Sequence, residues 1–245
     1  MGLFDSKDDR PVTTTSAPAP QPDGALDKMA QAFIGRLMNF GIDGIGPVDS
    51  AAEVVAKARK KHGDNVDKAI QEVVSDHVKA AGVGGFLTGF GGLVTMPVSL
   101  PANVLEFYTI ATRMVASIAE LRGYEVKSEG ARAAVLLTLV GADADDLIAK
   151  AGLSAANLTG SGRLARLAVT KMPKAAGMMI NKAVGFRLLT SVGGKALSRF
   201  IRFVPVAGGI VGAGLDGLLM KRIADHARTE FAARVPGEES TAIAE

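Results

Sequence analysis

The residues whose types and spacing could support chemistry begin with a set of three carboxylates. Asp143, Asp145 and Asp146 lie within four positions of one another, and clustered carboxylates are what metal binding and acid–base catalysis both need. The same residues open an expected helix that ends at Gly152, where the unpaired N–H groups of the first turn stabilise carboxylates. We expect this structural role for the three residues.

Glycine patterns and histidines give no enzyme signature. Residues 212–217 match the dinucleotide pattern GxGxxG literally. That fingerprint follows a strand in a βαβ unit, and the surrounding sequence is helical in pattern. His62, His77 and His226 are scattered and lack the spacing of metal ligands. We therefore predict a protein without catalysis, cofactor or metal.

A charge run of one sign is the second feature with chemical consequences. Between Leu147 and Leu215, 69 residues contain no Asp or Glu, although the whole chain carries only +3. A surface of one sign attracts anionic lipid, because each Lys or Arg near such a membrane contributes about 1 kcal/mol. The predicted membrane-binding residues are Arg163, Arg166, Lys171, Lys174, Lys182, Arg187, Lys195, Arg199 and Arg202.

The clearest part of this basic segment is an amphipathic helix. At 100° per residue, Lys195, Arg199 and Arg202 share one face, while Phe200 and Ile201 share the opposite one with other apolar residues. Such a helix suits an anionic membrane surface. A nucleic-acid surface is disfavoured, because the chain has no Trp and only two Tyr for stacking. An ordinary solvated face is the remaining alternative.

A long uncharged stretch precedes the basic segment. Residues 80–105 contain no charged side chain over 26 positions, which is long enough for a helix to span a bilayer. Six glycines and two prolines, Pro97 and Pro101, interrupt the stretch, and interrupted backbone at membrane depth must be satisfied by surrounding protein. We expect a buried packing element, with a membrane-inserted hairpin as the alternative.

A second uncharged, glycine-rich run covers residues 203–215. Both runs place small residues four apart, a spacing that lets helices approach closely, and we expect the two runs to pack together. The alternative function is a soluble carrier, a helical bundle whose apolar interior around Phe86, Phe90, Phe107 and Tyr108 holds a lipid or another apolar ligand. The residues predicted for this packing or pocket are Gly85, Phe86, Gly89, Phe90, Pro97, Pro101, Phe107, Tyr108, Gly208 and Gly212.

The elements that must position all these residues are predicted to be helices. Apolar residues recur at helical spacing over residues 26–40 and 66–81, the second of which Asp64 is expected to cap. Ser50 and Glu53 form a capping-box signature. The other expected helices cover residues 101–122, 130–140, 143–152 and 218–234. No stretch alternates apolar and polar residues for long, so the predicted fold class is all-α.

The domain organisation is predicted from composition. Residues 1–24 are polar and rich in Pro and Thr, so they cannot bury enough surface to offset chain entropy, and we expect a disordered tail. Residues 25–235 are expected to form one compact multi-helix domain, followed by a polar tail at 236–245. The chain contains no Cys, which excludes disulfides and fits a reducing compartment.

Glycine and proline patterns recur at three places. They are Met96-Pro97-Val98-Ser99-Leu100-Pro101 after a glycine-rich run, Arg122-Gly123-Tyr124-Glu125 at a helix end, and Val204-Pro205-Val206-Ala207-Gly208 followed by Gly212 and residues 227–231. Together these patterns resemble the EcsC family over about residues 66–233. The resemblance implies a bacterial helical protein, associated with a membrane and named from an operon that encodes an ABC exporter, with no established activity.

These observations predict a non-catalytic helical protein that is cytoplasmic and peripheral at the inner face of a membrane. The predicted partners are anionic membrane lipids and a membrane transporter or another membrane protein of a transport or secretion system. No nucleic-acid partner is expected.

Overall fold

The computed structural model describes residues 24–91, 96–151, 153, 162–193 and 208–234. Within these ranges, side chains are described except at 25–26, 84–91, 96–103, 191–193 and 208–213. The described residues form helices and a single isolated bridge between Ile45 and Val48, with no strand. The predicted all-α class is confirmed. The predicted tails at 1–24, apart from Gly24, and at 236–245 lie outside the described residues.

The first two helices follow local signals in the sequence. Helix α1 (Gly24–Leu37) continues into a short π-helix, η1 (Met38–Asp43). Helix α2 (Ala51–His62) begins with the predicted capping box. The Ser50 hydroxyl accepts from the Glu53 N–H (3.2 Å), and the Glu53 carboxylate accepts from the Ser50 N–H (2.7 Å). The backbone N–H groups of Ser50 and Glu53, which have no partner within the helix, are thereby satisfied.

Helix α3 (Val66–Gly91) begins at the predicted residue but differs from the prediction in its capping residue and in its end. Asn65 caps it by accepting from the Lys68 N–H (3.0 Å), so the prediction that Asp64 is the cap was wrong. The helix also continues past Gly82, where it was expected to end. A glycine inside a helix costs only about 1 kcal/mol, and packing against neighbouring helices outweighs that cost.

Helix α4 (Met96–Leu121) ends before Gly123, whose φ of +90° suits glycine. Helix α5 (Glu129–Val140) starts at Ser128, whose hydroxyl accepts from the Ala131 N–H (3.2 Å). The remaining helices are η2 (Gly141–Asp143), α6 (Ala144–Lys150), α7 (Arg163–Val169), α8 (Lys174–Gly193) and α10 (Gly208–Glu230). Helix α10 begins ten residues before its predicted start at 218 and ends before the predicted residue 234.

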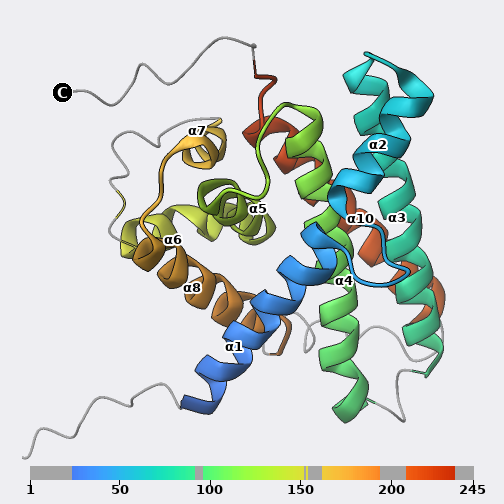
Figure 1. Ribbon diagram of the computed structural model, residues 1–245. Helices are drawn as coiled ribbons and strands as arrows, with labels where there is room; N and C mark the ends of the chain where they lie inside the picture. The colour runs from blue at the N-terminus through green and yellow to red at the C-terminus, as the bar shows by residue number, and fades with distance from the viewer. Residues whose placement is uncertain (1–23, 92–95, 152, 154–161, 194–207, 235–245) are drawn as a thin grey trace, which may run out of the picture.

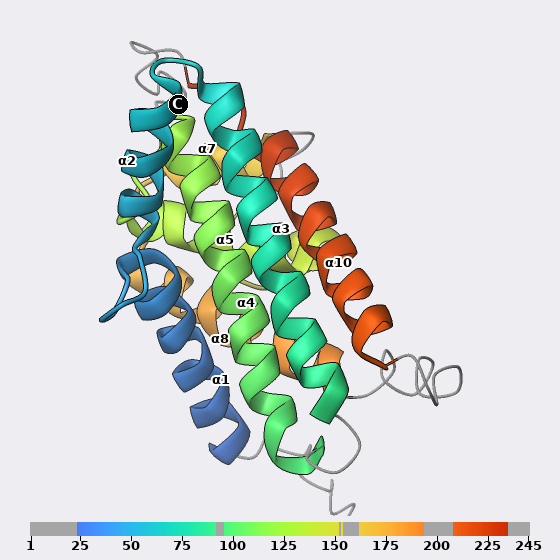
Figure 2. The ribbon, with the colours of Figure 1, turned by 90° about the vertical axis from the view of Figure 1, so that its right-hand side faces the viewer.

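The helices form two groups that share a core. In Figure 1, α2, α3, α4 and α10 lie on one side, α5 to α8 lie on the other, and α1 crosses α8. Figure 2 shows α3, α4 and α10 side by side, and α3 packs extensively against α10. These two helices carry parts of the two glycine-rich runs. Most side chains of those parts, at 84–91 and 208–213, lie outside the described residues, so the close packing of the runs stays a prediction.

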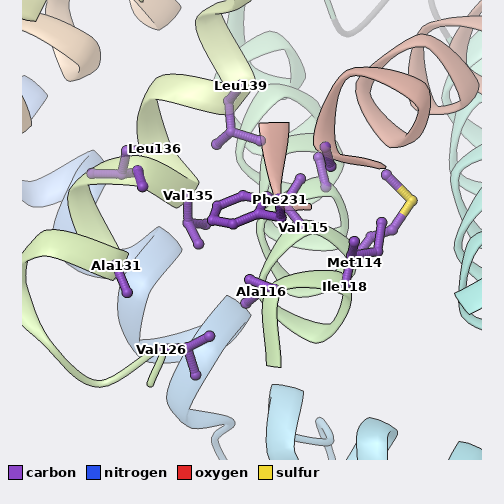
Figure 3. Close-up of a cluster of buried hydrophobic side chains, with 14 of the residues drawn as sticks. Met114, Val115, Ala116, Ile118, Val126, Ala131, Val135, Leu136, Leu139 and Phe231 are labelled. Atoms are coloured by element: carbon purple, nitrogen blue, oxygen red, sulfur yellow. The ribbon is translucent and has the colours of Figure 1, made fainter. Parts of the chain in front are cut away.

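Phe231 joins the two groups. Its side chain is fully buried and lies between Val115 of α4 and Val135 and Leu139 of α5 (Figure 3). Burying a side chain of this size contributes about 1.5–3 kcal/mol. The C-terminal end of α10 is thus part of the core.

Two of the patterns that carry the family resemblance meet at this point. The ring of Tyr124 packs edge-on against that of Phe231, with ring centroids 5.3 Å apart. The Tyr124 hydroxyl donates to the Ala232 carbonyl (2.9 Å), and the Arg234 N–H donates to the Arg122 carbonyl (3.1 Å). These residues therefore have a structural role, because they fasten the end of α4 to the end of α10.

Candidate functional site

Six of the nine predicted membrane-binding residues lie in the described part of the chain. They are Arg163 and Arg166 on α7, Lys171 in the connection that follows, and Lys174, Lys182 and Arg187 on α8. The predicted basic helix that contains Lys195, Arg199 and Arg202 lies outside the described residues.

Arg163, Lys182 and Arg187 pair with carboxylates of other elements. The ion pairs are Arg163 with Asp145 (2.5 Å), Lys182 with Asp27 (2.6 Å), and Arg187 with Asp143 (2.6 Å). Asp143 precedes α6, but its side chain makes no capping hydrogen bond. Asp145 and Asp146 lie in the first turn of α6, as predicted, whereas Arg187 binds the Asp143 carboxylate. Among the described residues, no group of His, Asp or Glu has the arrangement of a metal site.

Arg163 is directed into the protein. Its side chain is only 16% exposed, and its Nε lies 3.8 Å from the carboxylate of Glu230. Glu230 is buried at the end of α10 and accepts from the Leu164 N–H (3.2 Å) in the first turn of α7. This carboxylate is thus the anion that the start of α7 binds, and Arg163 contributes to the fold more than to a surface charge.

Lys171 and Lys174 are the cations best placed to meet a partner. Both are exposed, and neither forms an ion pair with a residue of the described ranges. Arg166 on α7 is exposed as well. A positive charge therefore lies where α7 leads into α8.

The outer face of α8 carries exposed apolar side chains, a feature that the sequence analysis did not identify. We define this face as Lys174, Met178, Met179, Lys182 and Phe186, of which the last four project within an arc of about 100°. Met178, Met179 and Phe186 are 65%, 51% and 42% exposed. An exposed patch of this kind, bordered by lysines, is typical of an interaction site.

The inner face of α8 explains why the sequence does not mark out the outer face. Ile180, Val184 and Leu188 are buried on the opposite side of the helix. Because both faces are apolar, the sequence of α8 does not show the contrast that marks an amphipathic helix. The signal in the sequence is a helix that is apolar all round yet also carries lysines.

Two of the residues predicted for apolar packing or a ligand pocket have described side chains. Phe107 and Tyr108 are partly buried against the core and pack edge-to-face, with ring centroids 5.3 Å apart. Burial raises the pKa of the Tyr108 hydroxyl. The side chains of the other predicted members lie outside the described residues: Gly85, Phe86, Gly89, Phe90, Pro97, Pro101, Gly208 and Gly212.

A charged pocket of about 310 Å³ lies between α2, α3 and α4. Its titratable lining residues are Asp49, Lys57, Glu72, Asp76, His77 and Arg113. The sequence analysis treated His77 as one of three scattered histidines. The pocket was not predictable, because its residues are brought together only when the three helices pack.

A second pocket, of about 370 Å³, is lined by residues that include Glu120, Tyr124 and Glu125. Burial, with the nearby charge of Glu125, raises the pKa of the Glu120 carboxyl. One oxygen of Glu120 is buried without a hydrogen-bond partner among the described residues. The unpaired oxygen and the raised pKa have the same cause, because burial disfavours the charged form of this carboxyl.

No helix in the described part of the chain combines the length and the apolar character needed to cross a membrane.

These features define a multi-helix protein with an exposed apolar and basic helix face and a charged pocket. The chain belongs to the EcsC protein family, whose model matches residues 52–235. No curated protein and no solved structure matches the chain.

Proposed function

We propose that the protein binds peripherally to the anionic inner face of a membrane and acts there without catalysis. The observation that carries this proposal is the outer face of α8, where Met178, Met179 and Phe186 are exposed beside two lysines. Exposed apolar side chains next to cations match the two parts of a membrane interface, the acyl boundary and the anionic headgroups.

The apolar part of the interaction follows from the exposed fractions. Burying a Met or Phe side chain completely contributes about 1.5–3 kcal/mol, so inserting the exposed parts of these three contributes about 2–5 kcal/mol. That free energy alone supports only weak binding. Charge must therefore supply the remainder.

The electrostatic part comes from the cations at the start of α8. Lys171 and Lys174 are exposed, and each contributes about 1 kcal/mol near an anionic surface. Three carboxylates of neighbouring elements face α8: Asp27 pairs with Lys182, Asp143 pairs with Arg187, and a Glu129 oxygen lies beside Gly177. Asp27 and Asp143 each offset one cation of α8, so the excess positive charge comes from Lys171 and Lys174.

The compartment and the wider role are part of the same proposal. Anionic lipids give the cytoplasmic leaflet its negative surface potential, and a chain without Cys suits the reducing side of that membrane. In this setting the protein acts as an accessory factor of a membrane transport or secretion system, with a membrane protein as a further partner.

Co-sedimentation with vesicles tests the proposal. We expect the full chain to bind vesicles of phosphatidylcholine and phosphatidylglycerol, and to bind pure phosphatidylcholine much less. Salt should weaken the binding. The variant Lys171→Glu/Lys174→Glu should lose about 30-fold or more in affinity, because two favourable charges become unfavourable.

Matched controls separate this face from a general surface effect. Lys60→Glu/Lys68→Glu makes the same charge change on exposed lysines of α2 and α3, and its affinity should change much less. Met178→Ser/Met179→Ser/Phe186→Ser should weaken binding, whereas Ile45→Ser/Leu218→Ser/Leu219→Ser, at other exposed apolar residues, should not. Equal loss in both members of each pair contradicts the proposal. Co-purified lipid without vesicle binding would favour the carrier alternative.

A further inference from the structure

The pocket between α2, α3 and α4 contains a cation that no described carboxylate neutralises. Its three carboxylates are already paired: Asp49 with Lys57 (2.6 Å), Glu72 with Lys61 (3.0 Å), and Asp76 with Lys79 (3.4 Å). His62 also contacts Glu72. Arg113 instead donates from Nη2 to the Phe40 carbonyl (3.0 Å), and it forms no ion pair with a described residue.

The state of Arg113 differs from that of other partly buried arginines. Arg122, Arg132 and Arg163 each have a buried Nε without a partner among the described residues, but each forms an ion pair with an aspartate. The Nε of Arg113 is buried and unpartnered too, and only the nearby charge of Asp49 opposes the burial that lowers the pKa of its guanidinium. A half-buried guanidinium without a direct counter-ion is costly, and an anion in the pocket would remove that cost.

His77 supplies an acceptor in the same pocket. Its Nδ1 lies 2.7 Å from the Val73 carbonyl, and a carbonyl only accepts, so Nδ1 carries the proton that is donated. Burial, assisted by the charge of Arg113, lowers the pKa of His77, while the Val73 carbonyl and Asp76 oppose this shift. The neutral imidazole therefore has a lone pair on Nε2, which has no partner among the described residues.

The other walls of the pocket are apolar. Val54 and Ala58 of α2, Val73 and Ala80 of α3, and Ile110 of α4 line it. The volume of about 310 Å³ lies at the lower end of the range for small-molecule sites. The pocket therefore offers a guanidinium for an anion, a neutral imidazole for a hydrogen-bond donor, and a short apolar wall for a short apolar chain.

We propose that this pocket binds a small carboxylate that carries a hydroxyl or amino group next to the carboxylate and a short apolar chain. Arg113 binds the carboxylate, because a guanidinium matches its geometry with paired N–H donors. His77 accepts from the hydroxyl or amino group, and the apolar chain lies along Val54 and Ile110. This site is separate from the outer face of α8 and does not depend on membrane binding.

The hydroxyl and amino forms of the ligand differ in charge, which allows an experiment to distinguish them. An amino group is an ammonium at neutral pH and is attracted by Asp49 and Asp76, whose carboxylates lie in the same pocket. A hydroxyl gains nothing from these carboxylates. The relative affinity for the two forms therefore measures how far the lysine partners already neutralise them.

NMR titration of the isotope-labelled full chain with 2-hydroxyhexanoate, 2-aminohexanoate and hexanoate tests the proposal. We expect saturable shifts of the Arg113 side-chain N–H and the His77 ring with at least one of the first two probes. Hexanoate lacks the donor for His77 and should bind about tenfold more weakly. The shifts map the site in the unaltered protein, so the wild-type titration decides even if a variant fails to fold.

Two variants assign the roles. Arg113→Gln should abolish saturable binding of the probes, whereas Arg59→Gln, at an exposed arginine of α2 outside the pocket, should leave it unchanged. His77→Leu should keep carboxylate binding and remove the preference over hexanoate. Absence of saturable shifts at Arg113 and His77 with all three probes would overturn the proposal, as would binding that Arg113→Gln does not weaken.

Discussion

The contact between α1 and α8 can be tested by one methyl group. A Cβ at Gly185 would lie 2.7 Å from the Ala30 carbonyl oxygen and 2.9 Å from a side-chain carbon of Ile34. The backbone of α1 therefore approaches α8 directly at this glycine. Overpacking of this kind costs about 1–3 kcal/mol, and the better helix propensity of Ala returns about 1 kcal/mol. Gly185→Ala is expected to destabilise the protein by up to about 2 kcal/mol.

The matched control is Gly177→Ala on the same helix. A Cβ there would meet a Glu129 oxygen at 3.4 Å and the Met172 sulfur at 3.6 Å, which are ordinary contact distances. This variant should be stabilised by up to about 1 kcal/mol, because only the propensity changes. The free energies of unfolding of the two variants should thus differ by about 1–3 kcal/mol in the direction stated.

Urea denaturation followed by far-UV circular dichroism measures these free energies, with equal m-values as the condition for comparison. Hydrogen exchange should also show faster exchange in α1 of Gly185→Ala than in α1 of Gly177→Ala. Equal stabilisation of both variants would refute the contact. Because α1 lies outside the residues that match the family model, this pair of variants tests a part of the fold that the family match does not cover.

Three further predictions concern the same core. Gly130→Ala should destabilise by about 3 kcal/mol or more in urea denaturation, because its Cβ would lie 2.5 Å from the Leu167 carbonyl oxygen and 2.7 Å from that of Thr170; an unchanged midpoint would contradict the packing of α5 on α7. Glu230→Gln should lower the free energy of unfolding by about 1 kcal/mol in the same assay, because the Leu164 N–H and Arg163 lose a charged partner. Glu125→Gln, at an exposed carboxylate, should leave this free energy unchanged. Burial lowers the pKa of both His77 and His226. Their contribution to the free energy of unfolding should be complete above about pH 6.5 and should be lost as the pH falls below that value, at up to about 1.4 kcal/mol per pH unit for each proton. A His77→Gln variant whose stability has the same pH dependence as the wild type would contradict this.

The features that the sequence predicted correctly depend on neighbouring residues. Ser50 with Glu53 caps α2 as expected, because a cap involves only residues three positions apart. The end of α3 was expected at Gly82 and the start of α10 at residue 218, but both helices continue through further glycines. Tertiary packing overrides the local cost of about 1 kcal/mol for each glycine.

The candidate site was predicted only in part, for a related reason. The sequence identifies the cations of α7 and α8, but not the pairing of Arg163 and Arg187 with Asp145 and Asp143, which requires α6 to lie beside them. The exposure of Met178 depends on which of two apolar faces of α8 turns inward. The charged pocket needs three helices to meet, and no local pattern encodes that meeting.

The most direct test of membrane binding is the environment of α8 on a vesicle. The chain has no Cys, so Met179→Cys and Leu219→Cys each give one site for an environment-sensitive fluorophore. Both positions are about half exposed, on α8 and α10 respectively. On phosphatidylglycerol-containing vesicles, we predict a blue shift and protection from an aqueous quencher for the label at 179, and neither for the label at 219. A label at 179 that stays in water while the protein co-sediments with the vesicles would contradict the proposed role of α8.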